Sequence, residues 1–218
     1  MCVNHILLIN LQIEQEWWIY MNLMNLSFHG MNIGQMVIWF FIYSFCGWAM
    51  ECVVIRLQLK RWENRGFAKL PFCVIYGFGV LIAMVLFMPI KDNIIAVYIA
   101  GCVGATIFEY LTAMAMIKLF GEVWWNYDHL RFNYKGILCL QSTLGWGLLA
   151  VFVFFVLNNV IENFARMISP AVANVIGIIL ILSYILDFAY HFVKNIHGFN
   201  SIDKNNSESK SLAHKIQK

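Results

Sequence analysis

Charged residues are scarce in this sequence of 218 residues. Asp, Glu, Lys and Arg together make up 12% of the chain and hydrophobic residues 61%, whereas soluble domains are typically about 25% charged and about 45–50% apolar. This composition excludes an ordinary water-soluble domain and is typical of a membrane protein. The formal net charge is only +3, and the basic residues gather at the ends of apolar runs, so no nucleic-acid partner is expected.

Several sequence motifs are also absent. The chain has no G-x-x-x-x-G-K-[ST] phosphate-binding loop, so an ATP-driven activity would need a separate ATPase subunit. Its six cysteines include no C-x-x-C pair, and most of them lie in apolar runs, where small buried side chains are expected instead of disulfides. No cofactor is predicted, and the chain is not expected to be an enzyme.

Long apolar runs dominate what is present. A membrane-spanning helix needs about 20 predominantly apolar residues, and five stretches qualify: 36–55, 70–90, 94–117, 136–157 and 170–193. The sequence therefore predicts an all-α, polytopic integral membrane bundle of five transmembrane helices within residues 34–197, followed by a polar tail, 198–218. The first 33 residues form an extension that either lies at the membrane interface or reflects a wrongly assigned start upstream of Met21, Met24 or Met31.

Lys and Arg are distributed unequally between the two sides of these spans. The side that follows the first, third and fifth spans carries thirteen of them, and the other side carries only Lys91 and Arg166. Because basic loops favour the cytoplasm, a multi-pass protein of the cell membrane is predicted, with its N-terminus outside and its C-terminus in the cytoplasm.

Ionisable side chains inside the predicted spans stand out against this background. Glu51 and Glu109 lie in the first and third spans, and Asp187 lies with His191 in the fifth. A charged residue in a membrane segment costs about 2.5–3.5 kcal/mol on insertion scales, so each is a candidate functional residue. At a rise of about 1.5 Å per residue, their distances from the nearest basic residues place all three acids in the cytoplasmic half of the bilayer.

Polar residues of two further spans fall at the same depth. They complete a set of candidates for a cytoplasm-facing polar cavity: Glu51, Glu109, Tyr76, Gln141, Ser142, Asp187 and His191. Three roles are open for this set: hydrogen bonding that holds the bundle together, a substrate or ion pathway, and catalysis by acids and His. Carboxylate and imidazole groups suit several divalent ions, but nothing in the sequence brings them to one point, so no metal site is predicted.

The two glutamates each open a similar order of residues. Trp62, Asn64, Cys73, Gly77 and Gly79 follow Glu51, and Trp125, Asn126, Cys139, Gly145 and Gly147 follow Glu109. This order predicts two parallel helix-pair repeats, 36–90 and 94–157, related by an axis along the membrane normal, with 170–193 as a separate fifth span. The glycines either allow close helix packing or soften the second and fourth spans.

The two loops that follow Glu51 and Glu109 are aromatic and charged. They form either an interfacial aromatic belt with snorkelling cations or a docking surface for a cytoplasmic partner. The partner-facing candidates are Trp62, Asn64, Arg65, Trp125 and Arg131. The lipid bilayer is the expected partner, and an ATPase subunit and a homo-oligomer are open alternatives, as is a regulatory or scaffold role.

Several of these segments resemble a known family. They are Tyr-Ser-Phe-Cys-Gly-Trp at 43–48, Asn-Arg-Gly-Phe at 64–67, Ile-Tyr-Gly-Phe-Gly at 75–79, Glu-Tyr at 109–110 and the stretch 125–147. Together they resemble the small bacterial membrane proteins of the putative ABC-transporter type IV family, over about residues 40–150. The resemblance implies a permease-like membrane subunit of an ABC transporter and says more about architecture than about substrate.

The chain departs from this family's pattern at three positions. Val74 replaces an expected Pro, Asn126 an expected Asp and Ile137 an expected Arg. The last two changes put a charge pair in the second loop in doubt. Glu51 and Glu109 are retained, whereas the fifth span lies outside the resemblance.

Overall fold

A computed structural model describes the backbone of residues 30–216 and the side chains of residues 30–57 and 60–194. The predicted N-terminal extension therefore lies almost wholly outside the described residues. The elements, in chain order, are α2 (Ile33–Leu59), α3 (Val74–Phe87), the 3₁₀ turn η1 (Met88–Ile90), α4 (Ile94–Phe120), β1 (Asn133–Tyr134), β2 (Leu138–Cys139), α5 (Leu140–Phe152), the π-helical turn η2 (Val153–Leu157), α6 (Asn158–Met167) and α7 (Pro170–Ile216).

The described chain is all-α apart from a two-stranded hairpin, and four of its helical stretches are long and apolar enough to cross a membrane. These are Ile33–Leu57, Ile94–Phe120, Leu140–Met167 and Pro170–Lys194. The prediction of a multi-pass helical membrane protein is thus confirmed. Within the described residues the second predicted span is shorter than expected, so four full-length spans are found there instead of five.

The second predicted span, 70–90, forms a helix only over Val74–Ile90. At about 1.5 Å per residue this helix is about 25 Å long, whereas a bilayer core is about 30 Å thick. Residues 70–73 stay in a loop because other elements take up their backbone groups. The Leu70 N–H donates to Asp187 Oδ2 at 2.7 Å, and the Cys73 N–H donates to the Ser44 carbonyl at 3.0 Å.

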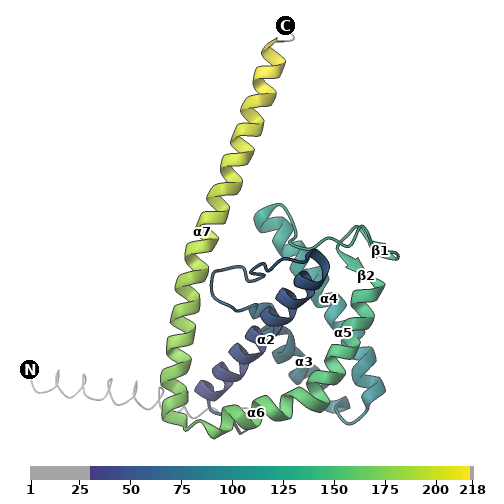
Figure 1. The fold of residues 1–218 in the computed structure, drawn as a ribbon, viewed down its shortest axis with the longest axis vertical. Coiled ribbons are helices and arrows are strands. Elements are labelled where there is room, and N and C mark those ends of the chain that lie inside the picture. Colours follow the sequence, from purple (N-terminus) through teal and green to yellow (C-terminus); the bar gives the residue numbers. More distant parts are fainter. Residues whose placement is uncertain (1–29, 217–218) are drawn as a thin grey trace, which may run out of the picture.

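The fourth predicted span begins at Leu140 and does not end at residue 157. The helix passes through η2 and continues as α6 to Met167, and its direction changes between α5 and α6, so that α6 runs across one end of the molecule (Figure 1). Polar residues of α6 such as Asn158 and Glu162 lower its mean hydropathy, so the sequence suggested an end at residue 157. The buried side chains of Ile161 and Ala165 anchor it instead.

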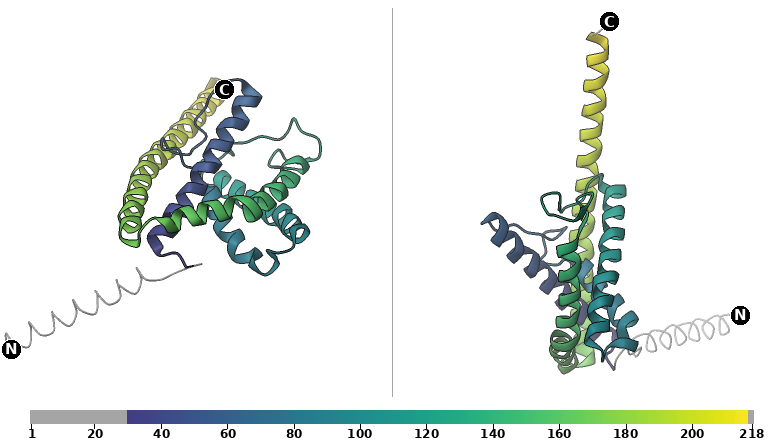
Figure 2. Two further views of the ribbon diagram at one scale, coloured as in Figure 1. Left: turned by 60° about the horizontal axis from the view of Figure 1, so that its bottom comes forward. Right: turned by 90° about the vertical axis from the view of Figure 1, so that its right-hand side faces the viewer.

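The helices are arranged around α2. It packs against α3 and α7, and α4 packs against α5. Figures 1 and 2 show α2 crossing obliquely between α7 on one side and the α4–α5 pair on the other, while the C-terminal part of α7 extends beyond the rest of the molecule.

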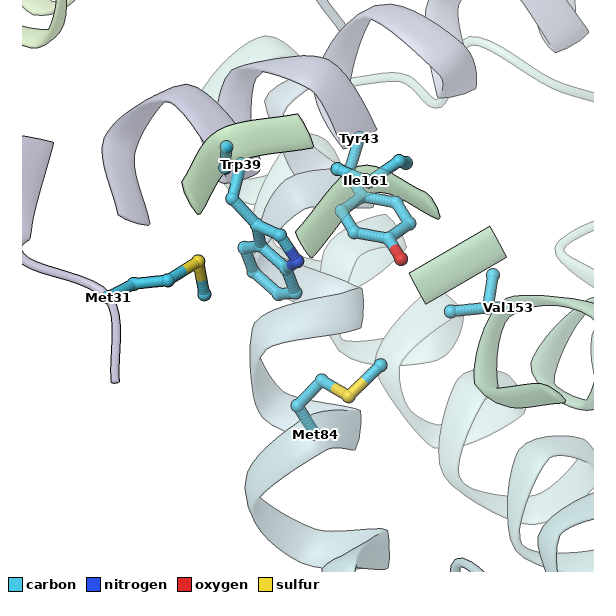
Figure 3. Close-up of a cluster of buried hydrophobic side chains, with 7 residues drawn as sticks. Met31, Trp39, Tyr43, Met84, Val153 and Ile161 are labelled. Atoms are coloured by element: carbon cyan, nitrogen blue, oxygen red, sulfur yellow. The ribbon is translucent and has the colours of Figure 1, made fainter. Parts of the chain in front are cut away.

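A hydrophobic core lies where α6 crosses α2 and α3 (Figure 3). It joins Met31, Trp39, Tyr43, Met84, Val153, Ile161 and Ala165. Polar tips are satisfied within it, because Asn158 Oδ1 accepts from Trp39 Nε1 at 3.1 Å and from the Tyr43 hydroxyl at 3.2 Å. This core fixes the end of the molecule opposite the two long loops.

These two loops are the first loop (residues 60–73), between α2 and α3, and the second loop (residues 121–139), between α4 and α5. The second loop ends in the β1–β2 hairpin, in which Asn133 pairs with Cys139 and Tyr134 with Leu138. Both loops lie at the same end of the bundle (Figure 1). They carry six basic residues, Lys60, Arg61, Arg65, Lys69, Arg131 and Lys135, as expected for loops on one side of a membrane.

Candidate functional site: two carboxylates capped by span and loop donors

Glu51, near the C-terminal end of α2, is bound from α3 and from the first loop. The Tyr76 hydroxyl of α3 donates to Glu51 Oε1, and Arg65 Nε of the first loop lies 3.8 Å from Glu51 Oε2. Gly47, one turn before Glu51, makes room for the tyrosine, since a Cβ at this position would lie 2.2 Å from Tyr76 Cγ. The glutamate therefore has one neutral and one cationic neighbour.

Glu109, on α4, is more deeply buried and accepts hydrogen bonds from neutral side chains. Only 8% of the surface of Glu109 is exposed. The Tyr127 hydroxyl of the second loop donates to Oε1 at 2.9 Å, and Trp146 Nε1 of α5 donates to Oε2 at 3.0 Å; Ser142 of α5 interacts with the same carboxylate. Each oxygen thus accepts a hydrogen bond from the protein, as a buried carboxylate requires.

The surroundings of the two acids meet. The Tyr76 and Trp146 rings, one from each set of donors, have centroids 6.0 Å apart, and the two carboxylates are near enough to interact electrostatically. Four of the seven predicted cavity residues, Glu51, Glu109, Tyr76 and Ser142, are therefore brought to one region of the bundle.

The helix contacts behind the two acids are alike. A Cβ on Gly77 of α3 would lie 2.6 Å from Ser44 Oγ, and a Cβ on Gly147 of α5 would lie 2.4 Å from Cys102 Sγ. Ser44 and Cys102 each stand seven residues before their glutamate. These contacts match Gly77 with Gly147 and not with Gly145, whose Cβ would meet nothing within 4 Å.

Tyr127 reaches Glu109 because the second loop is folded back on itself. The Tyr127 N–H donates to the Gly136 carbonyl at 2.9 Å, and the next amide, of Asp128, donates to Asn126 Oδ1 at 2.7 Å. Burial, and then the charge of Glu109, raise the pKa of the Tyr127 hydroxyl above its usual value near 10. This hydroxyl therefore stays protonated and able to donate at neutral pH.

The first loop is tied to the second. Arg65, which faces Glu51 through Nε, also donates from Nη2 to the Trp124 carbonyl at 3.0 Å. Asn64 shapes the loop, since its side-chain oxygen accepts from Trp48 Nε1 at 2.7 Å and from the Gly66 amide at 3.0 Å. The loop residues that bind the two acids are thus parts of one connected structure.

Aromatic rings extend this connection to α7. Phe67 of the first loop stacks on Trp124 of the second, with centroids 5.1 Å apart, and lies 4.7 Å from the Phe188 ring. Phe120 and Phe192 complete what is called here the aromatic cluster, made of Phe67, Phe120, Trp124, Phe188 and Phe192. It packs the two loops and the end of α4 against α7.

Asp187 and His191 form a pair on α7 that contacts the first loop. The two side chains form the predicted pair on one face of α7, with 3.2 Å between His191 Nδ1 and Asp187 Oδ1. The other Asp187 oxygen accepts from the Leu70 amide. The expectation that equal depth gathers all three acids stays a prediction for Asp187, whose contacts are to the first loop and to His191.

The remaining candidates divide into exposed and inward-facing residues. Gln141 and Arg131 are exposed, and so is Trp62, at 69%. Trp125 turns inward and donates from Nε1 to the Ile137 carbonyl at 2.8 Å; Asn64 and Arg65 make the internal contacts described above. Of the five partner-facing candidates, Trp62, Asn64 and Arg131 are therefore exposed, and Asn64 is at the same time held by internal hydrogen bonds.

Two residues that bind Glu109, Tyr127 and Trp146, were missed as candidates. Trp146 could have been found, because it immediately precedes Gly147 as Tyr76 precedes Gly77. Tyr127 gave no such signal, since its role depends on the fold of the second loop. Within the part of the chain that the structure describes, no group of three or more His, Cys, Asp or Glu residues is placed to hold a metal ion.

Comparison with known proteins extends the resemblance seen in the sequence. The family model described as putative ABC-transporter type IV matches residues 38–192, so the match includes both glutamates, their donors and the Asp187–His191 pair. Comparisons with curated proteins and with solved structures give no match. Because the matched segment covers well over half of the sequence and contains the whole two-carboxylate arrangement, the chain belongs to the putative ABC-transporter type IV family.

Proposed function

We propose that this protein is a permease-like membrane subunit of an ABC transporter, with its ATPase on a separate chain. Family membership supports the class, and the sequence contains no phosphate-binding loop of the G-x-x-x-x-G-K-[ST] type. The observation that carries the proposal is the pair of carboxylates, each contacted by one donor from a neighbouring span and by one loop residue, the cation Arg65 at Glu51 and the hydroxyl of Tyr127 at Glu109.

This arrangement supports a polar centre that opens when the loops move. In the described state Arg65 and Tyr127 take up one side of each carboxylate. A cation or polar substrate would replace these two loop side chains at the carboxylates. Tyr76 and Trp146, which belong to the spans, would keep their hydrogen bonds to Glu51 and Glu109. Arg65 also bonds the second loop, so the two loops would move together. The cytoplasm-facing cavity would exist after the two loops have moved away from the carboxylates.

The repeat and the orientation belong to the same proposal. The matched contacts of Gly77 with Ser44 and of Gly147 with Cys102 support two helix-pair repeats within the first four apolar helices. The basic loops at one end of the bundle support a cytoplasmic location for the first loop, the second loop and the C-terminus. The acids would then face the compartment that holds ATP.

Purification of the full-length chain from native membranes tests the ABC assignment. A tagged chain should retain a subunit that contains the phosphate-binding loop and hydrolyses ATP, identified by mass spectrometry and an ATPase assay. Trp62→Ala should weaken this association, because Trp62 is the most exposed aromatic residue of the first loop; Trp17→Ala, outside the matched segment, is the control. If no ATP-hydrolysing subunit is retained under mild detergent, the ABC assignment fails.

A binding-only, regulatory role is a second candidate, because all four carboxylate oxygens already have protein neighbours. Glu51→Gln and Glu109→Gln distinguish the two roles. For a transporter, both variants should insert normally and keep the ATPase subunit. When expressed in a deletion strain, each should restore the transport-dependent phenotype at least about tenfold less well than the wild type does. For a binding-only protein, both variants should keep the full phenotype and only Trp62→Ala should lose it.

A further inference from the structure

The C-terminal end of α2 carries basic residues that the proposed transport function does not use. Arg56, Lys60 and Arg61 fall within six residues and are all exposed. Glu63 pairs with Arg61 at 2.6 Å, but that arginine side chain remains 67% exposed. Three basic residues and one acid leave this end with a charge of +2.

Apolar side chains share a helix face with this charge. Val53, Arg56, Leu57 and Lys60 follow the i, i+3, i+4, i+7 spacing of one face; Val53 is 48% exposed and Leu57 76% exposed. Figure 2 shows, in its right-hand view, that this end of α2 diverges from the other helices. The face is therefore turned away from the bundle.

Along the chain, these residues change from apolar to basic to aromatic, which is the order from the interior of a membrane leaflet to its surface. Val53 and Leu57 come first, at the end of the apolar span that closes at Leu57. The basic residues come next, and the exposed Trp62 follows at the level where aromatic residues favour the interface. An acidic protein partner would meet the basic residues but would leave the two apolar side chains uncovered, whereas a phospholipid matches both.

The Arg56 guanidinium and the Lys60 backbone are held in place. Arg56 Nη1 donates to the Lys60 carbonyl, and the Lys60 amide donates to the Arg56 carbonyl at 3.0 Å. Lys60 adopts a left-handed conformation, with φ 56°, that ends the helix. By contrast, the last turn of α4 at the same end of the bundle has Lys118 as its basic residue and is followed by the acidic Glu122.

We propose that this end of α2 is a binding site for an anionic phospholipid. The phosphate lies between Arg56 and Lys60, with Arg61 beside it, and an acyl chain runs along Val53 and Leu57. The site shares no residue with the two-carboxylate arrangement, so its test is separate from that of the transport proposal.

Native mass spectrometry of the full-length chain tests the site, with phosphatidylglycerol or phosphatidylcholine of the same acyl chains added to the micelles. The wild type should retain phosphatidylglycerol in preference to phosphatidylcholine. A basic residue near an anionic surface contributes about 1 kcal/mol, about fivefold in binding. The Arg56→Gln/Lys60→Gln/Arg61→Gln variant should therefore bind phosphatidylglycerol at least about tenfold more weakly and phosphatidylcholine unchanged.

Two further variants keep the result interpretable. Lys118→Gln is the matched control and should retain phosphatidylglycerol like the wild type. Arg56→Lys/Arg61→Lys preserves the charge and should also retain it; if the triple variant does not fold, Lys60→Gln alone should lose about fivefold. Undiminished phosphatidylglycerol binding in the charge-removed variant, or an equal loss in Lys118→Gln, overturns the proposal. The proposal is also overturned if removing the charges changes only the oligomeric state or only the binding of an acidic protein.

Discussion

Glu51 and Glu109 differ in what compensates their charge. Arg65 faces Glu51 at 3.8 Å, whereas the neutral side chains of Tyr127 and Trp146 donate to Glu109. A buried carboxylate without a cation depends on each of its hydrogen bonds. The more buried glutamate is therefore expected to be the more sensitive to loss of a single donor.

Replacement of Trp146 by Phe tests this dependence. The Trp146→Phe variant keeps an aromatic ring against Tyr76 but removes the N–H donor to Glu109 Oε2. Interhelical hydrogen bonds in membranes contribute about 0.6 kcal/mol on average and up to about 1.7 kcal/mol, and a charged acceptor places this one near the upper end. Thermal unfolding in detergent should show a loss of about 1–2 kcal/mol. Trp62→Phe, at an exposed site, should be unchanged; equal effects would contradict the assignment.

At the scale of helices, close packing in the two helix pairs depends on glycines, among them Gly77 in one pair and Gly147 in the other. Gly77→Ala and Gly147→Ala would drive a Cβ to within 2.6 Å of Ser44 Oγ and 2.4 Å of Cys102 Sγ. Overpacking of this kind costs about 1–3 kcal/mol, so both variants should lower the midpoint of unfolding.

Gly145→Ala is the matched control for that pair of substitutions. Its Cβ would meet nothing within 4 Å, and Ala is favoured over Gly in a helix by about 1 kcal/mol. This variant should be neutral or more stable. Destabilisation by Gly145→Ala equal to that by Gly147→Ala would mean that α5 faces α4 differently.

The first loop and α7 are joined by the bond from the Leu70 amide to Asp187. A hydrogen bond to a charged group contributes about 1.5–3 kcal/mol, so Asp187→Leu should speed exchange of the Leu70 amide at least about tenfold, measured by hydrogen–deuterium exchange. Asp187→Asn keeps an acceptor oxygen and should show a smaller increase. An unchanged rate in Asp187→Leu would show that the aromatic cluster alone holds the loop.

The sequence predicted these elements unevenly. Hydropathy located the apolar helices because membrane insertion selects for composition over about 20 residues. It missed α6, whose burial rests on a few side chains such as Ile161, and it overextended the second span into a loop stabilised by distant partners. Glu51 and Glu109 were found because a charge in an apolar run is conspicuous. Gln141 is exposed, and depth along a helix does not define the face on which a residue lies, so its role stays a prediction.

At the scale of the whole molecule, the first and last described spans are packed against each other. A Cβ on Gly34 of α2 would lie 2.4 Å from the Asn174 backbone nitrogen of α7, and the Asn174 side-chain oxygen accepts from the Gly34 amide at 3.2 Å. The aromatic cluster adds contacts between α7 and the loops at the other end. The docking of α7 therefore closes the bundle.

A chain divided between α6 and α7 tests this closure. Residues 1–168 and 169–218, expressed together, should co-purify, because α2 and α7 pack against each other. Gly34→Leu in the first piece should reduce co-purification at least about tenfold, since its side chain has no room against the α7 backbone. Val160→Ala, at an exposed site of α6, should have no effect; undiminished association of the Gly34→Leu piece would contradict the packing.

The π-helical turn at Val153–Leu157 has a consequence for the register of this molecule. A π-turn accommodates one residue more than an α-helical turn, and an α-helix rotates about 100° per residue. The extra residue therefore resets the rotational phase of α6 relative to α5, which brings Asn158 to Trp39 and Tyr43. Deleting a single residue there would turn every α6 side chain by about a quarter of a circle while leaving the composition of the span almost unaltered.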